Sequence, residues 1–340
     1  PEGDRRLQPG QIVPDVRASK AAVRLRIALS RFDAEAQDQR ASGNPIEQQP
    51  LAQLGHAPHP DRIAAEMNRL GGQRFAALSR QGRPVEGLYQ AGPGAAVFIS
   101  GGQHANETSG VVGALRAAQA LNTTMGKPHF ALIALENPDG YALHRELCAH
   151  HPQHMHHAAR YSALGDDIEY REQAPLYERA AREQALALSG AQLHINLHGY
   201  PAHEWTRPLT GYVPRGFELW TIPKGFFLIL RHQPGWQAQG RALLEHVCAA
   251  LGQVAGLPEY NARQMALYER HAGELPFEVI KGTACMQTET TRAGAPVTLI
   301  TEFPDETVED DAFRFAHGVQ MQAVLAAVSA WQQLAKTAPK

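Results

Sequence analysis

The sequence has little of what marks several classes of protein. Its three cysteines, Cys148, Cys248 and Cys285, are too few and too far apart in the chain for a disulfide framework or a CxxC metal knuckle. No stretch approaches the roughly 20 apolar residues of a membrane span. Lys and Arg total 32 against 34 Asp and Glu, so the net charge is −2 and there is no excess of basic residues to attract nucleic acid or anionic lipid. We therefore expect neither a nucleic-acid nor a membrane partner.

The cysteine content also bears on location. Few, scattered cysteines favour a reducing compartment, and the opening segment PEGDRRLQPG is not typical of a signal peptide. We expect a cytoplasmic protein, although the absence of an initiating Met leaves room for an export signal removed upstream.

Histidine, in contrast, is abundant: the 340 residues include 17 of them. With so few cysteines beside them, a bound transition metal would take imidazole and carboxylate ligands rather than thiolates. The remaining composition, 44% hydrophobic and 19% charged, is that of an ordinary globular protein.

The order of apolar segments predicts an α/β fold with a mixed, largely parallel sheet. Four short apolar runs are typical of buried strands, and amphipathic segments between and after them are typical of helices. The strands are expected at 95–100, 129–135, 192–197 and 297–301, and the helices at 61–70, 109–121 and 311–335. We predict a catalytic domain over residues 56–336, preceded by an appendage or the remnant of another module over residues 1–55.

In such a sheet, functional residues collect at the carboxyl ends of the strands, so the polar residues after each apolar run are the candidates for a functional site. His104 and Glu107 follow the first run three residues apart, a spacing that lets an imidazole and a carboxylate reach one cation. The same spacing recurs at His271 and Glu274, but no strand is predicted before that copy.

The run LHINLHGY supplies a further candidate. As a strand it places His194 and His198 on one face, with His198 at the strand exit before a glycine. We interpret His194, which lies deeper, as a hydrogen-bonded core histidine, and His198 as a ligand beside His104 and Glu107.

A possible general base ends the last run. Glu302 follows the apolar segment VTLIT, where an isolated carboxylate is costly unless it is paired or used, and Pro304 is expected to stop the strand. Glu289 is the competing candidate, but it lies in a polar stretch.

Together these residues resemble the zinc carboxypeptidases of the carboxypeptidase A/B type and the related succinylglutamate desuccinylase and aspartoacylase group. The resemblance covers residues 59–331 and rests on five short motifs in the right order. These are GRP at 82–84, GGQHANE at 101–107, ENPDGY at 136–141, NLHGY at 196–200 and TEF at 301–303. It implies a three-layer α/β/α fold and one Zn²⁺ per chain, held by His104, Glu107 and His198, with Glu302 acting on a metal-activated water.

The resemblance also implies two arginines. By their order after the NPDGY motif, Arg145 resembles the transition-state arginine and Arg160 the clamp for the substrate's carboxylate, although Ala159 stands where the family has an Asn before the clamp and the DLNR motif of the deacylases is absent. The tract 144–157 contains six histidines, but neutral imidazoles in a loop with no order of carboxylates among them are more often solvated or adventitious binders.

The function implied is that of a zinc metallopeptidase, a hydrolase that releases a C-terminal residue from a peptide. The alternatives are an N-acyl-amino-acid deacylase and a non-catalytic zinc-binding protein of the same fold. The expected partner is a peptide or N-acyl amino acid with a free carboxylate. The sequence does not define the role of residues 211–236.

Overall fold

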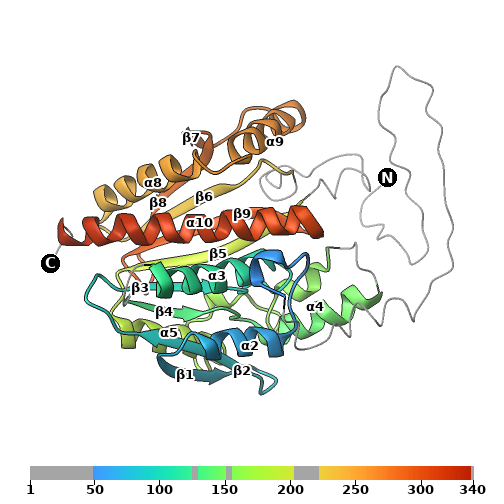
Figure 1. The fold of residues 1–340 in the computed structure, drawn as a ribbon, viewed down its shortest axis with the longest axis vertical. Helices are drawn as coiled ribbons and strands as arrows, with labels where there is room; N and C mark the ends of the chain where they lie inside the picture. The colour runs from blue at the N-terminus through green and yellow to red at the C-terminus, as the bar shows by residue number, and fades with distance from the viewer. Residues whose placement is uncertain (1–48, 125–128, 151–154, 203–221, 338–340) are drawn as a thin grey trace.

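The computed structural model describes residues 49–124, 129–150, 155–202 and 222–337 (Figure 1). Most of the predicted appendage lies outside these residues, including the segment VRLRIAL at 23–29, whose alternation of apolar and basic residues indicates a half-exposed strand. The part that is described belongs to the main domain: Leu51 and Leu54, within and just after the short helix η1 (Leu51–Gln53), are buried in its core. The division at residue 55 stays a prediction.

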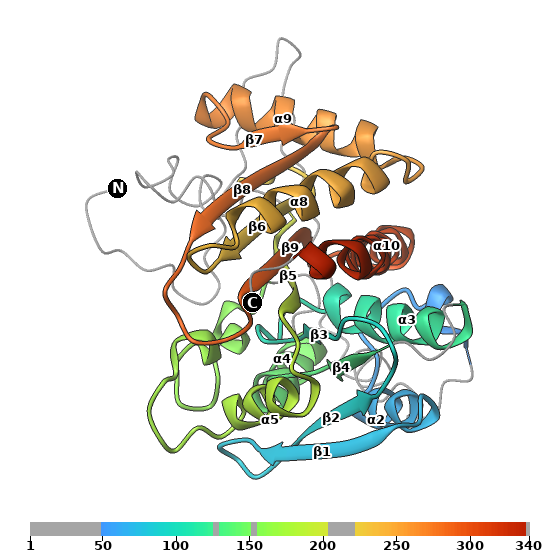
Figure 2. The same cartoon turned by 90° about the vertical axis from the view of Figure 1, so that its left-hand side faces the viewer.

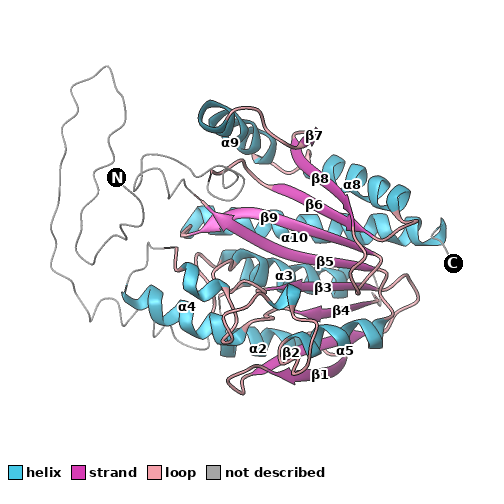
Figure 3. Cartoon of the chain, turned by 180° about the vertical axis from the view of Figure 1, so that it is seen from behind, coloured by secondary structure: helices cyan, strands magenta, loops and turns pink. Residues whose placement is uncertain are grey.

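A nine-stranded sheet forms the centre of the molecule, in the order β1-β2-β4-β3-β5-β9-β6-β8-β7. Seen from behind, β1 lies at one end of this order and β7 and β8 at the other (Figure 3). The strands are β1 (Gln73–Leu78), β2 (Pro84–Gln90), β3 (Val97–Gly101), β4 (Phe130–Ile133), β5 (Leu193–Pro201), β6 (Phe227–His232), β7 (Glu278–Ile280), β8 (Thr283–Glu289) and β9 (Val297–Glu306).

The sheet is mixed, which confirms the predicted fold class. Its central strands β4, β3, β5 and β9 pair in parallel, as do β6 and β8, while the remaining neighbours pair antiparallel. Strands β3, β4 and β5 are buried along their whole length, because both faces of the sheet are covered.

Helices cover both faces, giving three layers (Figure 2). Apolar side chains of α2, α3, α8 and α10 share one large core with the sheet, and α5 packs on the opposite face. The helices are α2 (Pro60–Arg69), α3 (Ser109–Thr124), α4 (Pro138–His150), α5 (Arg179–Ser189), α8 (Gln237–Leu251), α9 (Leu257–Ala272) and α10 (Asp310–Leu334), and the short helices are η2 (His157–Arg160), η3 (Ile168–Tyr170) and η4 (Ala335–Thr337). Within the described parts of the chain, no helix is long and apolar enough to cross a membrane.

One expectation about the last strands needs correction. Pro304 does not stop β9, which continues to Glu306. Strand β6 pairs with β9 only as far as Glu302, so beyond that point β9 has no strand on that side within the described residues, and a proline there costs no ladder hydrogen bond. The segment 211–236 contains a strand of its own, because β6 lies inside the sheet between β9 and β8. Residues 203–221 of that region lie outside the described residues.

Close contact between α3 and β5 fixes the two chain segments that lead to the site. Gly110 lies in the first turn of α3, and a Cβ there would be 2.8 Å from the carbonyl oxygen of Leu197, the residue before His198. We therefore expect Gly110→Ala to lower the free energy of unfolding by about 1–3 kcal/mol, measured by chemical denaturation.

Gly318→Ala is the matched control. Gly318 also lies in a helix, but its nearest foreign atom, Nη1 of Arg116, would be 3.6 Å from the new Cβ. The control should be neutral or stabilising by up to about 1 kcal/mol, because alanine favours a helix. Equal effects of the two substitutions would contradict the proposed close packing.

Candidate metal centre

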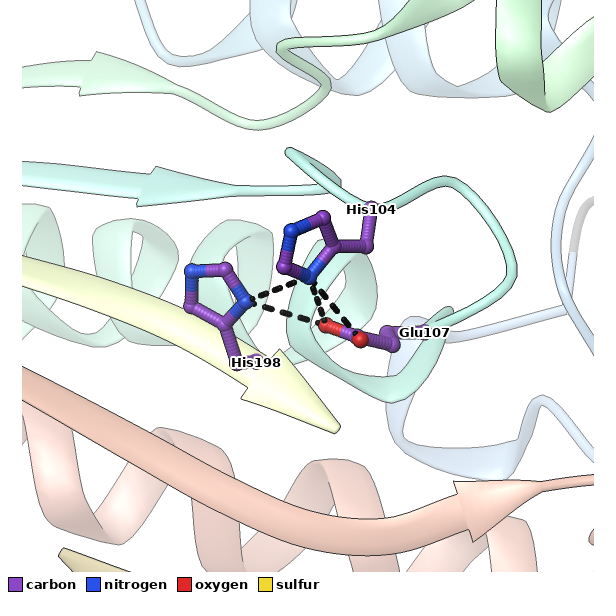
Figure 4. Close-up of side chains that lie close together, drawn as sticks. All are labelled: His104, Glu107 and His198. Carbon is purple, nitrogen blue, oxygen red and sulfur yellow. Dashed lines mark hydrogen bonds and ion pairs between the residues drawn. The ribbon is translucent and has the colours of Figure 1, made fainter. Parts of the chain in front are cut away.

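Three predicted residues lie together where β3 and β5 end. His104 and Glu107 belong to the turn between β3 and α3, and His198 belongs to β5. The two strands pair in parallel with Gly101 beside Leu197, so their exits are level. All three side chains are buried, and their ligand atoms lie within 4.8 Å of one another (Figure 4).

The spacing of these atoms suits a small cation. Nδ1 of His104 is 2.9 Å from Oε1 of Glu107 and 3.0 Å from Nδ1 of His198, which is 3.0 Å from Oε2 of Glu107. Around a tetrahedral zinc ion with bonds of about 2.0–2.1 Å, neighbouring ligand atoms are about 3.3 Å apart. The ligand atoms would therefore have to move apart by only a few tenths of an ångström to bind the ion. Two imidazoles and one carboxylate are also a known set of zinc ligands.

The charges around the group also suit a metal. Burial alone would raise the pKa of the Glu107 carboxyl, but His104, Arg160 and the hydrogen bonds of both histidines outweigh it and hold this pKa well below its usual range. Burial, aided by the nearby His104, lowers the pKa of His198. An ionised carboxylate and a neutral imidazole are the forms in which Glu107 and His198 can bind a metal. Burial lowers the pKa of His104, but Glu107 and Asp167 outweigh burial and raise it, so a metal bound by this imidazole would displace a proton.

A second carboxylate orients His104 from the far side of its ring. Oδ2 of Asp167 lies 3.0 Å from Nε2 of His104, and the Gln103 side chain donates to Oδ1 of Asp167 at 2.8 Å. The imidazole can therefore donate its Nε2 proton to Asp167 and present the lone pair of Nδ1 to a cation. Such a partner fixes the tautomer of a metal-binding histidine and increases its basicity.

The two predicted arginines lie in different surroundings. Arg160 ends η2 and donates a hydrogen bond from Nη1 to Oε1 of Glu107, so it is part of the cluster. Arg145 lies in α4, where its charge acts on Tyr141, His144 and Cys148. The roles suggested for both arginines stay predictions.

Glu302 lies beside His198 in the sheet. The two residues are register partners of the parallel pair β5 and β9, so their side chains project from the same face. Burial raises the pKa of the Glu302 carboxyl well above its ordinary value, and the nearby Glu107 carboxylate raises it further. Glu289, the last residue of β8, and Val297, the first residue of β9, both pair with His232 of β6. Glu289 therefore lies about 17 Å from Glu302 along the strand direction.

The other histidines occupy several environments. His194 lies in the core, where Nε2 is 2.8 Å from Oγ of Ser100 and the ring stacks on Phe98, in agreement with the prediction. In the histidine-rich tract, Nε2 of His144 is 3.4 Å from Sγ of Cys148, while 151–154 lie outside the described residues. A physiological metal role for this tract stays untested.

Two residues near the centre escaped the sequence analysis. Asp167 lies outside the motifs that indicated the ligands, next to Asp166, which pairs with Arg171. Lys224, a buried residue within electrostatic range of Glu302, precedes a strand that was not predicted. Neither residue follows a recognisable strand run, so the rule that located His198 and Glu302 did not reach them.

Comparison with known proteins gave only structural likenesses. No family model and no curated protein matches the chain. Similar solved structures include a provisionally named metallopeptidase of Shewanella denitrificans that is 17% identical in sequence. The superposed region covers 79% of this chain and 87% of the Shewanella chain, with a TM-score of 0.48. A metallo-carboxypeptidase of Burkholderia cenocepacia is 16% identical, with coverages of 83% and 70% and a TM-score of 0.47. The carboxypeptidase A of Helicoverpa armigera is 12% identical, with coverages of 89% and 81% and a TM-score of 0.48. The chemistry must be argued from the residues of this chain.

The contact between Asp167 and His104 generates a prediction about metal affinity. Asp167→Asn should weaken zinc binding about 10- to 100-fold, because the amide provides less electrostatic support to the imidazole. Competition titration with a chromophoric chelator measures this directly.

Asp166→Asn provides a matched control in the neighbouring position. Asp166 pairs with Arg171, so its amide variant should change stability and leave zinc affinity unaltered. If both variants bound zinc as tightly as the unmodified protein, Asp167 would not support a metal ligand.

Proposed function

We propose that the protein is a zinc-dependent hydrolase that cleaves an amide bond, and more narrowly a metallocarboxypeptidase that releases a C-terminal residue from a peptide. One observation supports this most strongly: a buried group of two imidazoles and one carboxylate lies next to a further carboxylate, Glu302, on the same face of the sheet. Ligands and a proton acceptor are the two parts that metal-assisted hydrolysis requires.

His104, Glu107 and His198 would hold the zinc ion. Bound there, zinc supplies a Lewis acid that makes water more acidic and polarises a carbonyl group. The protein holds two of these ligands in place, since Asp167 orients His104 and the backbone N–H of Gly199 donates to Oε2 of Glu107 at 3.0 Å. One zinc ion per chain is the expected content.

Glu302 would move the protons. As a base it accepts a proton from the attacking water, and as an acid it donates that proton to the departing amine nitrogen. Its buried position favours this exchange, because burial makes the carboxyl a stronger base than a solvated one. Its position beside His198 puts the carboxyl close to the ligand group.

Arg160 would bind the free carboxylate of the substrate. Its guanidinium contacts Glu107 and is attracted by Glu302 and Asp167, so a positive charge lies beside the ligand group. A guanidinium pairs well with a carboxylate and stabilises negative charge that develops on a carbonyl oxygen. A substrate with a free carboxylate next to the scissile amide fits this arrangement.

An N-acyl amino acid also has a carboxylate next to an amide, so the same contacts around Arg160 suit a deacylase. A panel of peptides with free C-termini should distinguish the two activities when it is assayed beside N-acyl amino acids. We expect chelator-sensitive release of C-terminal residues and slower turnover of the N-acyl compounds. Faster turnover of the N-acyl compounds would identify a deacylase, and stoichiometric zinc with no turnover of either class would contradict an enzymatic role.

The role of Glu302 is tested by its amide. Glu302→Gln should keep its zinc, because no ligand is changed, and should lose at least about a hundredfold in kcat, because an amide cannot accept the proton. Zinc content by mass spectrometry and steady-state kinetics give the two readouts.

Glu289→Gln is the control, since that residue lies level with the first residue of β9, at the edge of the sheet away from Glu302. It should retain the unmodified rate. A Glu302→Gln variant as active as this control would show that the base is misassigned.

A further inference from the structure

Three in-register residues form a row across the sheet next to the candidate metal centre. His198 of β5 pairs with Glu302 of β9, and Glu302 pairs in turn with Phe227 of β6. Directly paired residues project from the same face of a sheet, so Glu302 is flanked by an imidazole on one side and a benzene ring on the other. This row defines the surroundings of the proposed base.

Lys224 lies over this row. Its ammonium nitrogen is 4.4 Å from the ring centre of Tyr200, 4.7 Å from that of Phe227 and 5.8 Å from that of Tyr268, and the residue is fully buried. Tyr200 belongs to β5 and Phe227 to β6, the two strands on either side of β9. A cation that contacts both rings therefore lies above β9, on the face from which Glu302 projects.

The backbone around Lys224 is held firmly in place. Its N–H donates to Oη of Tyr200 at 3.0 Å, and that hydroxyl donates to the carbonyl oxygen of Gly225 at 2.5 Å. Gly225 has a φ of +86°, and a Cβ there would lie 2.6 Å from Oδ1 of Asn261, which accepts the N–H of Phe226. The ammonium position is thus set by the fold rather than by a flexible surface chain.

The charge of Lys224 matches its surroundings. Carboxylates gather at this end of β9, with Glu302, Asp305 and Glu306 all buried, and Arg160 is already bonded to Glu107. Burial lowers the pKa of Lys224 to about 7, whereas the attraction of Glu302 acts to raise it. Cation–aromatic contacts with Tyr200 and Phe227 compensate part of the cost of burying the ammonium group.

We propose that Lys224 is a positioning residue for Glu302: its ammonium group, fixed above β9, attracts the carboxylate and so favours the orientation needed for proton transfer. This inference rests on the proposed function, in which Glu302 is the base. Lys224 acts through Glu302 and not on the substrate, so it should influence kcat much more than KM.

Lys224→Met tests the inference, because methionine is similar in length and keeps the contacts with the rings while it removes the charge. We expect kcat to fall about 10- to 100-fold, with KM within about threefold and zinc content unchanged. Lys336→Met, the same substitution at an exposed position in η4, is the matched control and should behave as the unmodified protein. Lys224→Gln provides the same test if the methionine variant does not fold.

A double-mutant cycle separates action through Glu302 from a general structural effect. In the Glu302→Gln background, Lys224→Met should cause no further loss of kcat, because the group that it positions is already gone. An equal loss in both backgrounds, an unchanged kcat in Lys224→Met alone, or a loss of zinc would each overturn the inference. If Glu302→Gln alone retained full activity, the proposed function itself would fail, so the two failures are distinguishable.

Discussion

The buried carboxylate of Glu107 is the group on which the rest of the site depends. An isolated carboxylate away from water costs several kcal/mol, so its charge must be balanced by neighbours. Here the neighbours are two imidazoles, the guanidinium of Arg160 and the N–H of Gly199. They come from segments far apart in sequence. Because each of them contacts the carboxylate of Glu107, this anion helps to hold the segments together.

The sheet provides the precision that this meeting requires. Parallel pairing of β3, β5 and β9 brings their ends to one edge, and the register places His198 beside Glu302. Hydrogen bonds between the sheet and the covering helix layer then fix the strand ends: Gln320 of α10 donates to the carbonyl oxygen of His198 at 2.8 Å, and Asp305 of β9 accepts the N–H of Ser109, the first residue of α3, at 2.8 Å. The positions of the proposed ligands and base thus depend on backbone pairing more than on flexible side chains.

The sequence was informative wherever an apolar run led into a polar residue. This rule indicated His104, His198 and Glu302, because a buried strand is recognisable and its end is a defined place in an α/β sheet. Asp167 and Lys224 could not be predicted in this way, since one lies in an irregular loop and the other before a strand that is not in sequential order in the sheet. Pro304 misled for a related reason: its effect depends on the extent of β6, which only the tertiary pairing determines.

The central claim is that His104, Glu107 and His198 bind one zinc ion, beside which Glu302 accepts and donates protons. X-ray absorption at the zinc edge of the purified protein tests this most directly, because it identifies the atoms bonded to the metal. The account predicts two imidazole nitrogens and carboxylate or water oxygens at about 2.0–2.2 Å, with no sulfur neighbour. A sulfur ligand at about 2.3 Å, or zinc that remains bound in a His198→Ala variant with an unchanged spectrum, would contradict it.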